Sequence, residues 1–244
     1  MIRAVPLSVT LLAGMLLTLS LVVADEGAAP EGIAPELWHR LSEIDARGAE
    51  IETLIADVVQ EKHTLLLRRP LRSSGRVWVR GETMRWDTRE PRETQMLVTP
   101  SEVQLYYPEQ ALLEIYPVDE RLGELTASPL PRLKTMAEHF VITEEPVAEL
   151  LEQEPTLEGV EDVAFVALRL TPRDEALAEH MERVEVLLEP GRAVARRLVM
   201  VDADGERTVI TFNQLRLNED VEESHFELSV PLETRIVRAL EGGS

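Results

Sequence analysis

Short runs that alternate apolar with polar residues fill the stretch from 73 to 117. The clearest are Arg76–Arg80, where valines alternate with arginine and tryptophan, and Val103–Tyr107, where apolar and polar side chains take turns. Glycine, proline or a Ser-Glu pair interrupts the alternation at short intervals. Because successive side chains of a strand point to opposite faces, this pattern predicts consecutive antiparallel strands with one buried face.

The alternation returns in the second half of the chain. We expect further strands over residues 163–170, 183–188, 194–201, 207–217 and 226–230. The run Asp202–Gly205 is expected to join two of them as a hairpin turn, since its glycine can take a positive φ.

Apolar residues at helical spacing predict helices before these strands and between them. Residues 36–59 form the longest such stretch, with Leu37, Leu41, Ile44, Ile51, Ile55 and Val58 on one stripe. A second helix is expected over 128–140, a short one over 146–152 and a helical turn over 174–181. This order predicts a mainly β fold of the α+β class, with one strongly curved antiparallel sheet and helices on one face.

The first 24 residues have the form of a secretory signal peptide. A single charge, Arg3, precedes an apolar run, and the ending V-V-A offers small residues at the two positions that a signal peptidase reads. An uncleaved anchor is the alternative, because about 20 apolar residues can just span a bilayer. The rest of the chain is expected to form a flexible lead over 25–36, one domain over 37–238 and a tail over 239–244.

Composition excludes several classes of function. A formal net charge of −20 argues against binding nucleic acid or an anionic membrane surface through charge. The chain has no cysteine, which removes thiol chemistry and disulfides, and no serine lies in a G-x-S-x-G context. No metal-ligand spacing joins any of the five histidines, His39, His63, His139, His180 and His225. We therefore expect no metal, no cofactor and no enzymatic activity.

An ordered series of residues also carries a family resemblance. It consists of A-D-V-V-Q at 56–60, Gly75, Trp78, Met84–Trp86, Pro91, D-x-x-G-x-R at 202–207 and F-x-L-x-V-P at 226–231. The series resembles the LolA-like proteins, the periplasmic carriers of outer-membrane lipoproteins, over most of the chain. The resemblance implies an incomplete antiparallel β-barrel whose mouth is covered by helices, with the acyl chains of the cargo in its apolar concavity.

The resemblance implies a periplasmic carrier that shields acyl chains during transfer from the inner to the outer membrane. Its implied partners are an acylated lipoprotein or lipid cargo, an inner-membrane ABC-type release complex and an outer-membrane receptor, and we expect a monomer. One alternative is a periplasmic lipid or lipoprotein sensor on the same scaffold that regulates a membrane partner. Another is a structural envelope protein, which would need no cavity.

The side chains expected to contact the acyl chains come from the strands and from the second helix. On the strands they are Met84, Trp86, Met96, Leu105, Leu187, Leu198 and Met200, although alternation does not reveal which face of each strand is concave. On the helix they are Leu133, Met136 and Phe140, which form either the inner face of a mobile lid or part of an immobile core. The resemblance implies that Arg80 latches this lid, and the alternative is an exposed Arg80 that stacks on Trp78.

Overall fold

The computed structural model describes residues 28–117, 128–153, 155 and 157–238. The expected signal peptide and the tail over 239–244 lie outside these residues. The expected flexible lead lies partly inside them, and there Ile33 is buried in the core, only 5% exposed. The polypeptide is therefore anchored to the domain just before the first helix begins at Pro35.

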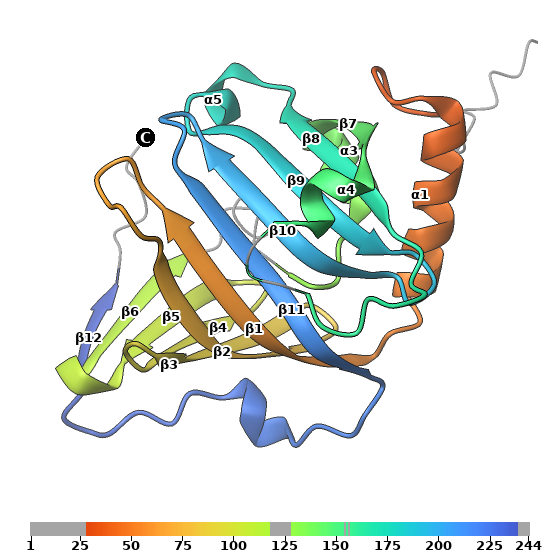
Figure 1. Ribbon diagram of the computed structural model, residues 1–244. Helices are drawn as coiled ribbons and strands as arrows, with labels where there is room; N and C mark the ends of the chain where they lie inside the picture. Colours follow the sequence, from red (N-terminus) through yellow and green to blue (C-terminus); the bar gives the residue numbers. More distant parts are fainter. Residues whose placement is uncertain (1–27, 118–127, 154, 156, 239–244) are drawn as a thin grey trace, which may run out of the picture.

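The described strands form one open, strongly curved sheet (Figure 1). Its order is β12-β6-β5-β4-β3-β2-β1-β11-β10-β9-β8-β7, and every neighbouring pair is antiparallel except β12 with β6. The strands are β1 (Thr53–His63), β2 (Leu71–Arg80), β3 (Thr83–Glu90), β4 (Thr94–Val98), β5 (Glu102–Tyr107), β6 (Leu112–Pro117), β7 (Phe140–Glu145), β8 (Val166–Pro172), β9 (Met181–Glu189), β10 (Val194–Asp202), β11 (Arg207–Leu217) and β12 (Arg235–Arg238). The predicted fold class is confirmed.

The helices of the described residues are few and short. They are α1 (Pro35–Gly48), α3 (Leu133–His139), α4 (Val147–Leu151) and α5 (Glu175–Ala178), with 3₁₀ turns η1 (Pro108–Gln110) and η2 (Glu223–Phe226). Within the described part of the chain, no helix has the length and apolar character needed to cross a membrane.

Side-chain alternation gives the sheet two distinct faces. Val77 and Val79 of β2 belong to the main core cluster together with buried residues of α1 and α3, whereas Trp78 between them belongs to a separate cluster. We call the face that carries α1 and α3 the inner face and the other the outer face. One hydrophobic cluster runs across the inner face from β4 to β7, so the core lies inside the curve of the sheet.

The first helix is shorter than its apolar spacing predicts. It ends at Gly48, and the chain then enters β1 at Thr53, so the predicted helix over 36–59 is wrong in its second half. Residues 51–59 are rich in β-branched side chains, which lose rotamer freedom in a helix and pack well on a sheet. A stripe at spacings of three and four was compatible with a helix, but pairing with both β2 and β11 stabilises the strand.

Two further segments differ from expectation. Phe140 begins β7, which pairs with β8, instead of ending the helix over 128–140. The predicted strand over 226–230 lies outside the sheet: its alternate residues Leu228 and Val230 pack on an outer-face cluster of β5 and β6. Apolar and polar residues alternate in this segment because one side of it packs on the sheet, although its backbone does not pair with a strand. The chain rejoins the sheet only at β12.

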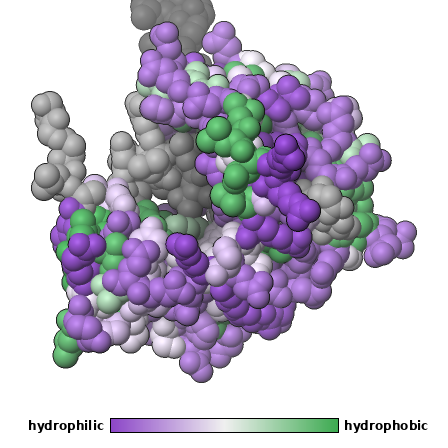
Figure 2. Space-filling view, turned by 60° about the vertical axis from the view of Figure 1, so that its left-hand side comes forward, coloured by the Kyte–Doolittle hydropathy of each residue, from purple (hydrophilic) through white to green (hydrophobic). Residues whose placement is uncertain are grey.

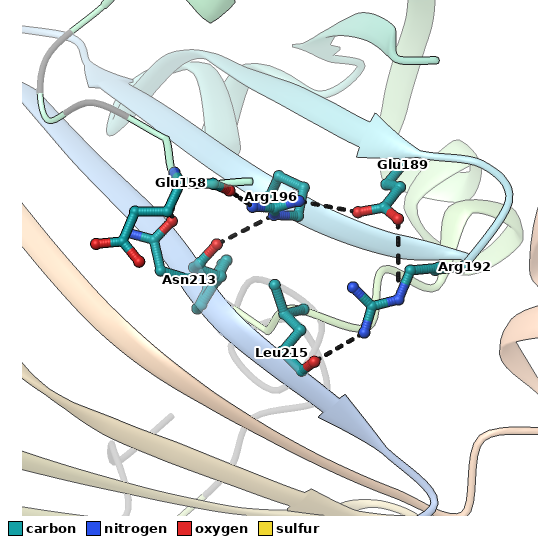
Figure 3. Close-up of polar contacts among 7 residues, drawn as sticks. Glu158, Glu189, Arg192, Arg196, Asn213 and Leu215 are labelled. Carbon is teal, nitrogen blue, oxygen red and sulfur yellow. Dashed lines mark hydrogen bonds and ion pairs between the residues drawn. The ribbon is translucent and has the colours of Figure 1, made fainter. Parts of the chain in front are cut away.

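Two buried arginines, Arg196 and Arg197, hold the segment after α4 on the outer face. Figure 3 shows the contacts of Arg196. The Arg196 side chain, 4% exposed as a residue, forms an ion pair with Glu189 at 3.0 Å and donates to the carbonyls of Phe212 and Glu158. The fully buried Arg197 donates to the carbonyls of Leu150 and Pro155. Buried backbone acceptors of this irregular segment thus find charged donors, and its position is fixed.

Candidate functional site

Four of the residues expected to line the concavity lie side by side on the inner face. Trp86 pairs with Met96 across β3 and β4, and Met96 pairs with Leu105 across β4 and β5. Met84 lies two residues before Trp86 and therefore on the same face. Met84 and Trp86 are buried in the main cluster, while Met96 and Leu105 are half-buried.

The three candidates from the second half of the sheet divide between the faces. Leu198 is buried in the inner cluster, and the half-buried Met200 packs against it. Leu187 lies on the outer face, fully buried with Leu150 and Ala167 beneath α4, so its assignment to the concave face is wrong. Val186 and Leu188, the residues before and after it, belong to the inner cluster. Because both faces of the strand are buried along an apolar run such as Val186–Leu188, the sequence does not reveal which of its side chains point inward.

Methionine is concentrated at this inner face. Met84 belongs to the main cluster, and the other four methionines of the described residues, Met96, Met136, Met181 and Met200, pack against it while remaining half-buried. The thioether side chain is unbranched, flexible and polarisable, and it adapts to apolar partners of varied shape. The partly accessible margin of the core can therefore accept an apolar ligand without a rigid fit.

Helix α3 covers part of this face, and it is held at both ends. The two carboxylate oxygens of Asp45, on α1, accept hydrogen bonds from the amides of Leu133 and Lys134 at 2.9 and 2.7 Å. At the other end, Nε of Arg173 donates to the carbonyls of Ala137 and Phe140, both at 3.0 Å. We call Asp45 and Arg173 the α3 clamp.

Opposing effects act on the pKa of Asp45, the carboxylate of the α3 clamp. Burial raises the pKa of Asp45, and the amides of Lys134 and Leu133 act in the opposite direction by hydrogen-bonding to the charged form. The charged carboxylate also lies at the amino end of α3, where unpaired amides attract negative charge.

The residues of the second predicted helix that were expected to contact acyl chains are buried in the core, with one exception. Leu133 and Ala137 are fully buried in the main cluster, and Phe140, now the first residue of β7, is 2% exposed. Met136 is half-buried and packs against the same cluster. The apolar face of α3 thus rests on the inner face, and only Met136 offers accessible apolar surface.

Arg80 lies on the outer face, away from the helix that it was expected to latch. It donates a hydrogen bond to the carbonyl of Val221, and its guanidinium carbon lies 4.7 Å from the centroid of the Phe226 ring. Arg85 donates to the carbonyl of Glu227 at 2.8 Å. Both interpretations of Arg80 drawn from the sequence, the latch on the helix and the stacking on Trp78, are therefore corrected. The partners of Arg80 belong to residues 219–234, which we call the C-terminal strap.

Two polar hollows open on the outer face. One, of about 250 Å³, lies between the strap and strands β3 and β4, and its lining includes Arg85, Asp87 and His225. The other, of about 390 Å³, is lined by residues such as Asp57, Arg76 and Arg216. Charged linings of this kind do not suit acyl chains. Among the described residues, no group of three or more His, Asp or Glu is placed to hold a metal ion.

Comparison with protein families agrees with this architecture. Residues 49–229 match the model of the family described as "Outer membrane lipoprotein carrier protein LolA". The chain belongs to the LolA family. The match begins at the turn before β1 and ends within the C-terminal strap, so it includes the whole candidate site except α1. A search of curated proteins found no match.

Solved structures of low sequence identity resemble the chain. An uncharacterised conserved protein from Thermus thermophilus shares 15% identity with a TM-score of 0.49, over 82% of this chain and 98% of that one. The LolA superfamily protein NE2245 from Nitrosomonas europaea shares 13% with a TM-score of 0.41, over 78% and 96%. MucB in the MucA/MucB complex of Pseudomonas aeruginosa shares 14% with a TM-score of 0.45, over 78% and 60%.

Proposed function

We propose that this protein is a periplasmic carrier that holds the acyl chains of a lipoprotein, or of another lipid, against its inner face. The observation that carries the proposal is the gathering of the described methionines at the margin of the inner core, with four of them half-buried. Membership of the LolA family supports the class of cargo. The amino-terminal sequence supports export from the cytoplasm.

Acyl chains would enter where the sheet is covered only in part. Helices α1 and α3 pack against the inner face, and the half-buried Met96, Met136 and Met200 lie at the limits of that packing. Displacement of α3 would expose the underlying leucines and valines to cargo. The α3 clamp would then be the element that opens, since it joins this helix to α1 and to the chain after β8.

Reversible transfer requires that cargo binding is not too strong. Each buried methylene contributes about 0.8 kcal/mol, so fully enclosed acyl chains would dissociate too slowly for a carrier. Closure of α3 over the empty face gives the cargo-free state favourable contacts of its own, which offset part of the gain on binding. By family resemblance, an ABC-type complex at the inner membrane would load the carrier and an outer-membrane receptor would accept the cargo.

Uptake of a fluorescent fatty acid by purified protein tests this proposal. Replacing two accessible thioethers by amides of similar shape, Met96→Gln with Met200→Gln, is expected to weaken uptake at least tenfold, because burying an amide without a partner is unfavourable. The matched control is Val59→Thr, a similar polar exchange at a half-buried residue of β1 whose side chain points outward. Equal uptake by all three proteins would refute the inner face as the site.

A second measurement addresses the carrier role itself. Native mass spectrometry of protein isolated from the periplasm is expected to show a bound lipid or acylated protein. That cargo should pass to acceptor vesicles bearing the receptor. A sensor would retain its ligand under these conditions, so retention would exclude the carrier and favour the regulatory alternative.

A further inference from the structure

The hairpin between β1 and β2 ends in an unusually apolar loop. Leu65, Leu66 and Leu67 are 80%, 91% and 47% exposed, and Leu71, the first residue of β2, is 58% exposed. Figure 2 shows an apolar patch beside strongly hydrophilic side chains on the side of the molecule where this hairpin projects. We call residues 64–71 the hairpin tip. A contiguous exposed apolar patch of this kind marks a surface that binds something.

The charge of the tip is opposite to that of the molecule. Arg68 and Arg69 are exposed, and neither has a hydrogen bond or ion pair with any described residue. The cations that flank the tip on the two strands are paired, Lys62 with Glu206 at 3.1 Å and Arg72 with Glu61 at 3.5 Å. From position 62 to position 72 the sequence contains no acidic residue, although the chain as a whole has 45 acidic and 25 basic side chains.

Leucines next to unpaired arginines are typical of segments that bind at a membrane interface. The leucines can enter the acyl region while the arginines remain at the level of the phosphates. Acidic side chains of the neighbouring β10–β11 turn, such as the exposed Asp204, would be repelled by the same phosphates, so contact would be limited to the tip.

We propose that the hairpin tip docks this protein on the surface of an anionic phospholipid bilayer. The total charge argues against such binding, but the local charge decides it, since interactions between exposed charges are screened within about 10 Å. The proposal is independent of what the inner face holds. It places the carrier at a membrane through its own residues.

Co-sedimentation with vesicles tests the proposal. Purified protein is expected to bind vesicles of equimolar phosphatidylcholine and phosphatidylglycerol, and to bind phosphatidylcholine alone much more weakly. Replacing Arg68→Gln and Arg69→Gln together is expected to reduce binding by roughly 25-fold, about fivefold for each basic residue at an anionic surface. Replacing Leu65→Ser with Leu66→Ser should abolish binding. The control Leu232→Ser, at a leucine that is 105% exposed but outside the tip, should leave it unchanged.

A site-specific label measures insertion directly, because the chain has no cysteine. A polarity-sensitive dye on Leu66→Cys is expected to shift to shorter wavelength with the mixed vesicles, whereas the dye on Leu232→Cys should not. Absence of binding by the unmodified protein, or equal binding by the tip variants and the control, would overturn the proposal. Thermal unfolding confirms that each variant is folded, and fatty-acid uptake by the tip variants should equal that of the unmodified protein. Absence of fatty-acid uptake by an unmodified protein that still binds the mixed vesicles would instead refute the carrier and leave the docking of the tip standing.

Discussion

Asp45 connects the first helix to the helix that covers the inner face. Its carboxylate accepts the first amides of α3, so Asp45→Ala leaves those donors without a protein partner. We expect a loss of about 1–2 kcal/mol in the free energy of unfolding, as for other lost helix caps, and faster exchange of bound fatty acid. Asp202→Ala is the matched control, because it removes the carboxylate that accepts the Glu206 amide in the β10–β11 turn and leaves both ends of the α3 clamp unchanged. Equal exchange rates in both variants would show that the clamp does not limit opening.

The raised pKa of Asp45 predicts a dependence of stability on pH. A carboxyl whose pKa is higher in the folded than in the unfolded state binds its proton more tightly when folded. Its stabilising contribution is therefore complete below the unfolded pKa, about 3.9, and is lost as the pH rises through the folded pKa. We expect Asp45→Asn, which cannot titrate, to gain stability relative to the unmodified protein over that interval. Denaturant unfolding at a series of pH values measures the difference, and a constant difference would contradict the prediction.

The clamp shows why this part of the site could not be predicted from the sequence. Asp45 and Arg173 bond to backbone atoms, so their partners have no characteristic residue type. Asp45 also lies 88 residues from Leu133 in the sequence, and only the packing of α1 beside α3 brings them together. Met84, Trp86, Met96, Leu198 and Met200 were predictable because an apolar residue within an alternating run is buried on one of two faces.

At the scale of the elements, close approach of β2 and β3 depends on one glycine. A Cβ atom at Gly75 would lie 1.9 Å from the carbonyl oxygen of Asp87, a backbone atom that cannot rotate away. Gly75→Ala should therefore separate the strands near the bulge at Ser74 and reduce stability by about 1–3 kcal/mol. Gly191→Ala is the control, because no atom lies within 4 Å of its added Cβ. Comparable melting temperatures for the two variants would contradict this explanation.

Strands were more predictable than the limits of helices. The sequence pattern identified β2 to β6 and β8 to β11. One buried face imposes a period of two on a strand, and a strand buried on both faces, such as β9, gives a continuous apolar run. It failed at residues 51–59, where apolar spacing fits a helix and a strand equally well, and only pairing with β2 and β11 decides. The short β12 was not predicted, since its four exposed residues carry no burial pattern and its pairing with β6 is parallel.

At the scale of the whole molecule, the C-terminal strap joins the middle of the sheet to one edge. It leaves β11, crosses the outer face and places β12 beside β6 (Figure 1). On its way it covers Ile55 and Trp78 with Val221 and Phe226, and it covers Tyr106 with Leu228. The strap thus shields the outer face, as α1 and α3 shield the inner one, and the two coverings use different residues. They should respond to mutation separately.

This separation can be tested with the two arginines that bind the strap. Arg80→Gln with Arg85→Gln removes donors to the carbonyls of Val221 and Glu227, each bond contributing about 1.5–3 kcal/mol because its donor is charged. We expect a lower melting temperature and faster cleavage by a glutamate-specific protease within the strap, at Glu222 or Glu227. Fatty-acid uptake and release should be unchanged, because the inner face keeps all its contacts. Arg183→Gln, which loses an ion pair with Glu185 on β9, controls for the loss of an arginine elsewhere on the sheet. Altered release in the double variant, with the control unaffected, would show that the strap and α3 move together and would return Arg80 to the role of a latch.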